Sequence, residues 1–188
     1  FKGLFTQGMV CHETYKDENN NWLSPDEISS DDGKKFYLKS NPDTTVNVGP
    51  SESMSKSKKN TIDPKKIIEI YGADAVRLFI LSDSPPEKDV QWSDSGMNSS
   101  FKFVQKFWLI ADQIIKSDKL KKTQFNNELE FFTNQSINKI NIALDKFSYN
   151  VIVAVFHEIY SFLKKTLDEN KNYENLQDNF KKILIVMS

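Results

Sequence analysis

Residues 49–60 read GPSESMSKSKKN, and this stretch divides the sequence into two unlike parts. Lysines alternate with serines along it, and it carries no aliphatic side chain to pack in a core. Before it the sequence is polar and rich in turn residues, with short apolar pieces. After it, apolar residues recur at helical spacing almost to the C-terminus. We therefore expect a small β-rich part followed by an all-helical part.

The part before the stretch predicts short strands joined by turns. Residues 4–11, LFTQGMVC, predict a buried strand, and residues 45–48, TVNV, predict a second strand that leads into the stretch. Residues 13–35 contain the polar runs DENNN, SPDE and SSDDGKK, which are typical of turns. We expect a small β-rich insertion here, with hairpin turns and low stability of its own.

Two helices are predicted directly after the stretch. Asp63 suits the N-cap of the first helix, and Pro64 suits its first position. Gly72 ends or kinks this helix, and a second helix is expected over residues 73–81. Residues 82–96 then predict a loop that contains two consecutive prolines.

From Phe101 onward the sequence predicts only helices. Neither glycine nor proline follows Gly96, so nothing interrupts them, and antiparallel helices with short connections form a bundle. Phe107 and Trp108 lie on the apolar face of the first of these helices and are predicted to be core residues, whereas Phe103 lies off that face. The alternative is that these rings stack on RNA bases. The apolar positions are Val104, Phe107, Trp108, Ala111, Ile114 and Ile115; Ile137, Ile140, Leu144 and Phe147; Ile152, Val155, Phe156, Ile159, Leu163 and Leu167; and Leu176, Phe180, Ile183, Leu184 and Met187.

Composition limits the possible functions. The net charge of −1 gives no overall basic signature for nucleic-acid binding, so such a partner has to be reached through local clusters. Cys11 is the single cysteine, which excludes an internal disulfide, and the two histidines are too far apart for a structural zinc site, so no metal site is expected. These features favour a reducing, cytoplasmic compartment. The chain starts on Phe1 and ends within an apolar run, so we expect a piece of a longer protein.

The lysine-rich stretch has two interpretations on its own chemistry. Lysine ammonium groups neutralise phosphate, serine hydroxyls donate to phosphate oxygens, and the helix N-terminus at residue 63 adds partial positive charge. A loop of this kind can close on a triphosphate and stabilise the charge that develops as pyrophosphate leaves. A run of charge is also typical of a solvated surface loop. Composition and spacing leave both interpretations open.

Residues 53–57, SMSKS, resemble the KMSKS signature of class I aminoacyl-tRNA synthetases. The surrounding sequence resembles leucyl-tRNA synthetases, in the same order along the chain, from about residue 7 to residue 108. Ser53 stands where the family signature has its first lysine, and no HIGH-type histidine motif is present. The matching segments are Gln7 to Val10, Trp22 to Pro25, Asp63 to Asp74, Val76 to Phe79, Ser84 to Glu87, Val90 to Trp92 and Gly96.

The resemblance implies a fold and three parts. Residues 1–62 are expected to be the α/β edge of a Rossmann-like catalytic domain, with a leucine-specific-type β-rich insertion over about residues 12–47. Residues 63–96 are expected to be connecting helices and a loop. Residues 97–188 are expected to be a truncated all-α bundle of the anticodon-binding type.

The resemblance also implies a function and site residues. The family activates leucine with ATP, which binds with Mg²⁺, and transfers leucine to tRNA(Leu). Lys56 is expected to act catalytically on the ATP phosphates, and the expected ATP-binding residues are Met9, Val10, Met54, Ser55, Lys56 and Ser57. The tRNA-binding candidates are Arg77, Lys102 and Lys106, with Lys121 and Lys122 further along, although a salt bridge or a solvated helix face explains them equally well.

Without the HIGH-type motif this piece is expected to be inactive alone. The longer enzyme is expected to be monomeric and to have no membrane segment. Two alternatives stay open: a stand-alone helical RNA-binding module without catalysis, and a synthetase of the isoleucyl or valyl type. The long insertion before residue 49 favours the leucyl type.

Overall fold

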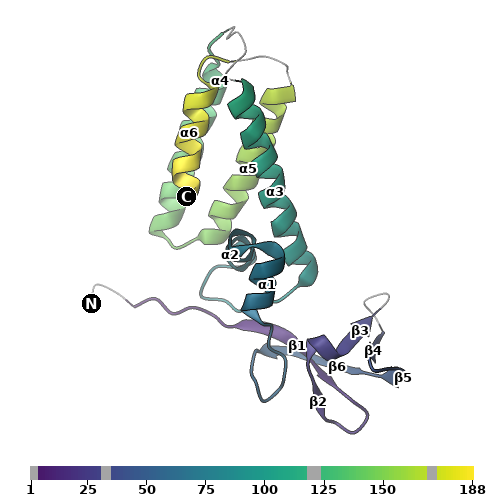
Figure 1. Cartoon of the computed structure of the whole chain (residues 1–188). Coiled ribbons are helices and arrows are strands. Elements are labelled where there is room, and N and C mark those ends of the chain that lie inside the picture. Colours follow the sequence, from purple (N-terminus) through teal and green to yellow (C-terminus); the bar gives the residue numbers. More distant parts are fainter. Residues whose placement is uncertain (1–3, 31–34, 118–123, 169–172) are drawn as a thin grey trace.

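The computed structural model describes residues 4–30, 35–117, 124–168 and 173–188, so Lys121 and Lys122 lie outside the described residues. Two small sheets lie below the lower end of a tall helical bundle in the view of Figure 1. The expectation of a small β-rich part followed by helices is confirmed. The first sheet contains β1 (Val10–Lys16), β2 (Trp22–Leu23), β6 (Asn47–Ser53) and β7 (Val90–Gln91), and the second contains β3 (Ile28–Ser30), β4 (Phe36–Leu38) and β5 (Asn41–Thr45).

Strand β1 is the centre of the first sheet. It pairs antiparallel with β2 on one side and with β6 on the other, and Val10 and Cys11 pair in parallel with β7. The buried strand predicted over residues 4–11 is therefore wrong in its bounds, because the strand begins at Val10 and continues through polar residues to Lys16, and Leu4 is 91 % exposed. Pairing with β7 from Val10 and with β6 from Cys11 decides this, since a strand forms where a neighbouring strand bonds to it and not only where the sequence is apolar.

A small core joins the second sheet to the first. Tyr15 and Leu23 from the first sheet pack with Ile28 and Val46, and Phe36 and Leu38 cover them partly. The predicted second strand over residues 45–48 is divided in two, because β5 ends at Thr45 and β6 begins at Asn47. Val46, buried between them, marks the point where the chain leaves one sheet for the other.

Helices α1 (Pro64–Tyr71) and α2 (Ala73–Ser82) begin and end where the sequence predicts. The Asp63 side chain caps α1 by accepting from Lys65 N at 2.9 Å. Gly72 separates the two helices at φ 80°, a backbone conformation that favours glycine. Phe79 of α2 packs with Val90 and Met97, so a second core joins the helices to the sheet.

The bundle consists of α3 (Asp94–Ser117), α4 (Asn127–Asp145), α5 (Tyr149–Asp168) and α6 (Leu176–Met187), which confirms the predicted helices. The loop predicted over residues 82–96 is too long, because α3 already begins at Asp94. Its core is apolar and is drawn from all four helices. The fully buried side chains at its centre are Ile114, Leu129, Ile140, Ile159, Leu163, Leu176, Phe180 and Ile183. In the part of the chain that the structure describes, no helix has the length and apolar character needed to cross a membrane.

The aromatic residues of α3 correct two predictions. Phe103, expected to lie off the apolar face, is buried with 7 % of its surface exposed, and Phe107 is partly buried against the bundle core. Trp108, predicted to be a core residue, is 75 % exposed. The buried positions of α3 are Met97, Ser100, Phe103, Ile110 and Ile114, spaced by three to seven residues along one face. Trp108 follows Phe107 by one residue, about 100° around the helix, and therefore points away from this face.

A charged contact joins α6 to α4. Glu130 accepts from Lys182 Nζ at 2.9 Å and from Asn179 Nδ2 at 2.8 Å. These two hydrogen bonds, with that from Lys182 the stronger influence, lower the pKa of Glu130 from 4.5 to about 2. The carboxylate is thus held in its charged form across the interface between the two helices.

The lowered pKa makes this contact dependent on pH. Because the folded pKa of Glu130 lies below its unfolded value, its stabilising contribution is complete above about pH 4.5 and is lost as the pH falls toward 2. We expect Glu130→Gln to lower the urea midpoint at pH 7, and we expect the difference from wild type to shrink steadily below pH 4.5. Urea unfolding followed by circular dichroism from pH 7 to pH 2.5 measures this. A difference that is constant over the whole range would contradict it.

Candidate functional site

Two strands bring the candidate site residues together. Cys11 of β1 pairs with Ser53 at the end of β6, and the Met54 N–H then donates to the Val10 carbonyl at 3.1 Å. Val10, the first residue of β1, therefore lies beside the segment that follows β6, and Met9 directly precedes it. We call that segment, residues 54–60, the Ser/Lys loop.

The Ser/Lys loop is a tight turn with internal hydrogen bonds. The Lys59 N–H donates to the Lys56 carbonyl at 3.3 Å, and the Lys58 N–H donates to Ser55 Oγ at 3.3 Å. The hydroxyls of Ser55 and Ser57 lie 3.2 Å apart. Lys59 has a φ of 54°, a left-handed conformation that costs energy in a residue other than glycine. This turn presents Lys56 and Ser57 on the surface.

The three lysines of the loop differ in their surroundings. Lys58 forms an ion pair with Glu52 of β6, so its charge is already compensated. Within the described residues no ion pair involves Lys56, and its side chain is exposed. Lys59 is likewise exposed and has no ion pair among the described residues, so Lys56 and Lys59 are the loop lysines whose charge is available to an anionic ligand. Ser53, which stands before the loop, lies with its hydroxyl 3.9 Å from the Cys11 sulfur.

Asn60, at the end of the loop, is a residue that sequence reasoning missed. It is fully buried, and its carboxamide bonds to the backbone at three points. Its Nδ2 donates to the carbonyls of His12 at 3.2 Å and Glu52 at 3.1 Å, and its Oδ1 accepts from Ser55 N at 2.8 Å. An asparagine at the end of a run of serines and lysines is expected to be solvent-exposed, so no signal in the sequence predicts that it is buried.

Met9 is held from the opposite side by the segment that leads into β7. Its N–H donates to Asp89 Oδ1 at 2.8 Å, and its carbonyl accepts from Val90 N at 2.9 Å. A Cβ on Gly8 would lie 2.1 Å from the Lys88 carbonyl oxygen, so only glycine permits this approach. The Met9 side chain is 56 % exposed beside the start of β1.

The candidate RNA-contacting residues lie on the helices. Arg77 of α2 is exposed and donates to Asp74 Oδ1 at 3.1 Å, one turn earlier, so the salt bridge considered as an alternative is present. Lys102 and Lys106 lie one turn apart on the exposed side of α3. Among the described residues no hydrogen bond or ion pair joins these three side chains to the Ser/Lys loop. The structure places them on the surface of α2 and α3 without linking them to the candidate site.

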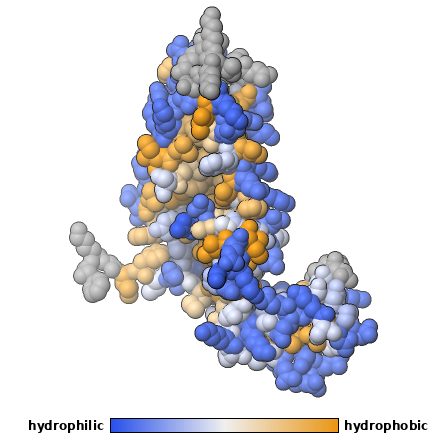
Figure 2. Space-filling view, viewed as in Figure 1, coloured by the Kyte–Doolittle hydropathy of each residue, from blue (hydrophilic) through white to orange (hydrophobic). Residues whose placement is uncertain are grey.

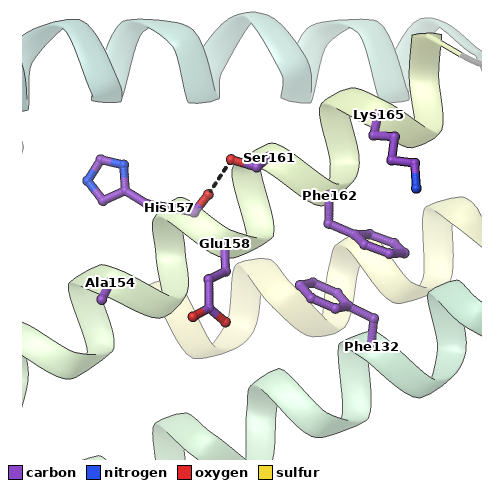
Figure 3. A pocket seen from close by; sticks show the side chains of 7 residues that line it. All are labelled: Phe132, Ala154, His157, Glu158, Ser161, Phe162 and Lys165. Atoms are coloured by element: carbon purple, nitrogen blue, oxygen red, sulfur yellow. Dashed lines mark hydrogen bonds between the residues drawn. The ribbon is translucent and has the colours of Figure 1, made fainter.

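The bundle carries a separate surface hollow of about 550 Å³. Figure 3 shows that its side chains come from α4 and α5, with the rings of Phe132 and Phe162 face to face, 4.0 Å apart. The Ser161 hydroxyl donates to the backbone carbonyl of His157 at 2.9 Å, so the two side chains do not form a nucleophile and base. The His157 ring packs on Phe103 at 4.1 Å, and burial lowers its pKa. We infer no chemistry at this hollow.

Metal binding finds no support in the described residues. They contain no group of three or more histidine, cysteine, aspartate or glutamate side chains placed to hold a metal ion. His12 is buried with its Nδ1 2.9 Å from the Glu13 carbonyl, which gives it a local structural partner.

Comparison with known proteins relates the chain to aminoacyl-tRNA synthetases. Residues 45–93 match the family model described as tRNA synthetases class I (I, L, M and V). The leucine–tRNA ligase of Rickettsia bellii is 40 % identical over an alignment 189 residues long, which covers 100 % of this chain and 22 % of the relative. That of Rickettsia prowazekii is 47 % identical over 154 residues, 82 % of this chain and 18 % of the relative. That of Hyphomonas neptunium is 41 % identical over 169 residues, which are 88 % of this chain and 20 % of the relative.

A solved structure supports the same relationship at the level of the fold. A crystal structure described as the ternary LeuRS–tRNA–LeuAMS complex of Agrobacterium radiobacter aligns with a TM-score of 0.55 and 19 % identity, over 63 % of this chain and 16 % of that one. The chain spans about a fifth of the length of the curated relatives that it matches.

Proposed function

We propose that the Ser/Lys loop of this chain binds the phosphates of ATP during leucine activation. The premise is that the chain belongs to the leucine–tRNA ligases, as a segment of about a fifth of their length. The observation that carries the proposal is Lys56. It is exposed and has no ion-pair partner among the described residues, while Lys58 is paired with Glu52. Lys59 is exposed as well, and what distinguishes Lys56 from it is its place as the second lysine of the resembled signature. The hydrogen bond from Met54 N to the Val10 carbonyl holds the start of this loop against β1.

Leucine activation needs positive charge near the phosphates of ATP as pyrophosphate leaves. In the activation step the leucine carboxylate attacks the α-phosphorus of ATP, the bond to the bridging oxygen breaks, and pyrophosphate leaves with the negative charge. A lysine that meets this charge lowers the barrier most when it binds the transition state more tightly than the ground state. Lys56 has that role in our proposal. The hydroxyls of Ser55 and Ser57 and the Met54 backbone line the same turn.

The segments on either side complete the proposal. Residues 1–62 would form the α/β edge of a Rossmann-like catalytic domain, with the inserted module over about residues 12–47 and with Met9 and Val10 near the adenine. Residues 63–96 would connect this edge to an anticodon-binding-type bundle over residues 97–188. Arg77, Lys102 and Lys106 are the proposed contacts to tRNA phosphate, where exposed cations act independently of sequence.

Metal, partners and location follow from the same proposal. Mg²⁺ would arrive with ATP and neutralise phosphate charge. Because the residues around the loop offer hydroxyls and lysines and no cluster of carboxylates among the described residues, the ion would be held by ATP oxygens and by residues outside this segment. The complete enzyme would be a cytoplasmic monomer that binds leucine, ATP and tRNA(Leu).

The test compares amino acids in the complete enzyme that carries this segment. We expect ATP–pyrophosphate exchange that depends on leucine, transfer of leucine to tRNA(Leu), and no exchange by the 188-residue chain alone. Exchange that depends on isoleucine or valine instead would favour the related synthetases. Salt-sensitive binding of tRNA by a complete protein that shows no exchange with any amino acid would favour an RNA-binding module.

A further inference from the structure

Asn60 joins three backbone segments through one side chain. Its two donated hydrogen bonds reach the carbonyls of His12 and Glu52, which are directly opposed residues in the β1–β6 ladder. Its oxygen accepts from the N–H of Ser55, the second residue of the Ser/Lys loop. With no exposed surface, the carboxamide makes these bonds away from water. Buried hydrogen bonds of this kind are costly to lose, because the groups left behind are unpaired.

The bond to Ser55 closes the base of the loop. It joins the residue before Lys56 to the residue after Lys59, so both ends of the turn are fixed to the two strands. The internal bond from Lys59 N to the Lys56 carbonyl then defines the turn itself. The base of Lys56 is thereby placed relative to β1, although its long side chain is exposed to solvent.

We propose that Asn60 is a positioning residue: by holding both ends of the Ser/Lys loop on the β1–β6 ladder, it sets the place from which Lys56 reaches the phosphates. This rests on the proposed function, and it adds a residue whose side chain touches no substrate. A catalytic group acts efficiently only when its support holds it near the productive geometry, and a displacement of about 1 Å caused elsewhere can cost about a hundredfold in rate.

The chemistry of the contact makes an aspartate substitution informative. Aspartate has the shape of asparagine but, when ionised, accepts hydrogen bonds and donates none. Asn60→Asp therefore keeps the volume of the side chain while it removes both donations and turns a negative charge toward the carbonyls of His12 and Glu52. Asn138→Asp, at an exposed position of α4, makes the same chemical change away from the loop and serves as the matched control.

The kinetic experiment uses the complete enzyme and corrects for the fraction of active sites. We expect Asn60→Asp to lower kcat for leucine-dependent exchange about tenfold to a hundredfold, with the KM for leucine unchanged within about twofold. If Asn60 acts through Lys56, the double variant Lys56→Ala, Asn60→Asp should be no slower than Lys56→Ala alone. Independent losses that multiply in the double variant, or a kcat within twofold of wild type for Asn60→Asp, would overturn the proposal.

A second measurement tests the structure of the Ser/Lys loop independently of catalysis. Hydrogen exchange of the peptide that covers residues 54–60 should be faster in Asn60→Asp and in Asn60→Ala, and unchanged in Asn138→Asp. Unchanged exchange in an active enzyme would overturn the positioning role and leave the proposed function intact. A wild-type enzyme without leucine-dependent exchange would overturn the proposed function, and the catalytic part of this inference with it.

Discussion

Lys56→Ala is expected to slow leucine-dependent ATP–pyrophosphate exchange by about a hundredfold to a thousandfold in the complete enzyme, the cost typical of removing one group that stabilises charge in the transition state. The side chain is exposed and carries no structural ion pair among the described residues. The loss should therefore fall on kcat for activation and leave the folded protein unchanged. Pyrophosphate exchange at saturating leucine, with ATP varied, separates kcat from the KM for ATP.

Two other lysines make this result specific. Lys65→Ala removes the same charge from the first turn of α1. The Lys65 backbone N–H donates to Asp63, and this bond does not depend on the Lys65 side chain, so we expect an exchange rate within about twofold of wild type. Lys58→Ala breaks the ion pair with Glu52 and should have a smaller effect than Lys56→Ala. Equal losses in all three variants would mean that the loop contributes only general positive charge. Unchanged exchange in Lys56→Ala would remove its catalytic role.

The helices were predictable because their signals are local. The Asp63 cap, the Pro64 start and the break at Gly72 act within one or two turns, and each lies where the sequence predicts it. The apolar periodicity from residue 101 onward likewise located all four bundle helices. Local chemistry also predicted a loop before this helix N-terminus, but the loop is shorter than predicted, because β6 continues to Ser53 through residues 49–53.

The features that could not be predicted depend on partners distant in sequence. The start of β1 is fixed by the parallel pairing of Val10 with Val90 of β7, distant in sequence, and local apolar character in residues 4–11 carries no such information. The same is true of Asn60, whose bond to His12 spans 48 residues. Trp108 shows a different limit: apolar spacing predicted a broad face on α3, but only packing in three dimensions shows where that face ends. The roles of Lys56, Arg77, Lys102 and Lys106 stay predictions.

Phe180→Ala is expected to be the most destabilising single change in the bundle. Phe180 lies in the core with 2 % of its surface exposed, and its ring is stacked near that of Phe107, with centroids 6.2 Å apart. Removing a buried phenylalanine ring loses its transfer free energy and leaves a cavity, which together cost about 3–5 kcal/mol. This is a large share of the roughly 5–15 kcal/mol by which a domain is stable. Urea unfolding followed at 222 nm measures it, since that signal reports the helices.

The matched control uses the same substitution on the neighbouring helix. Phe131 of α4 is 69 % exposed, so Phe131→Ala removes a ring of equal size that is mostly in water already, and the free energy of unfolding should change by no more than about 0.5 kcal/mol. The contrast between the two variants tests where the core of the bundle lies, independently of any catalytic role. Because α6 packs on α4 and α3 through Phe180 and its neighbours, loss of the ring should also weaken the contact that Glu130 makes with Lys182. Equal costs for the two substitutions would mean that α6 does not pack on the bundle through Phe180.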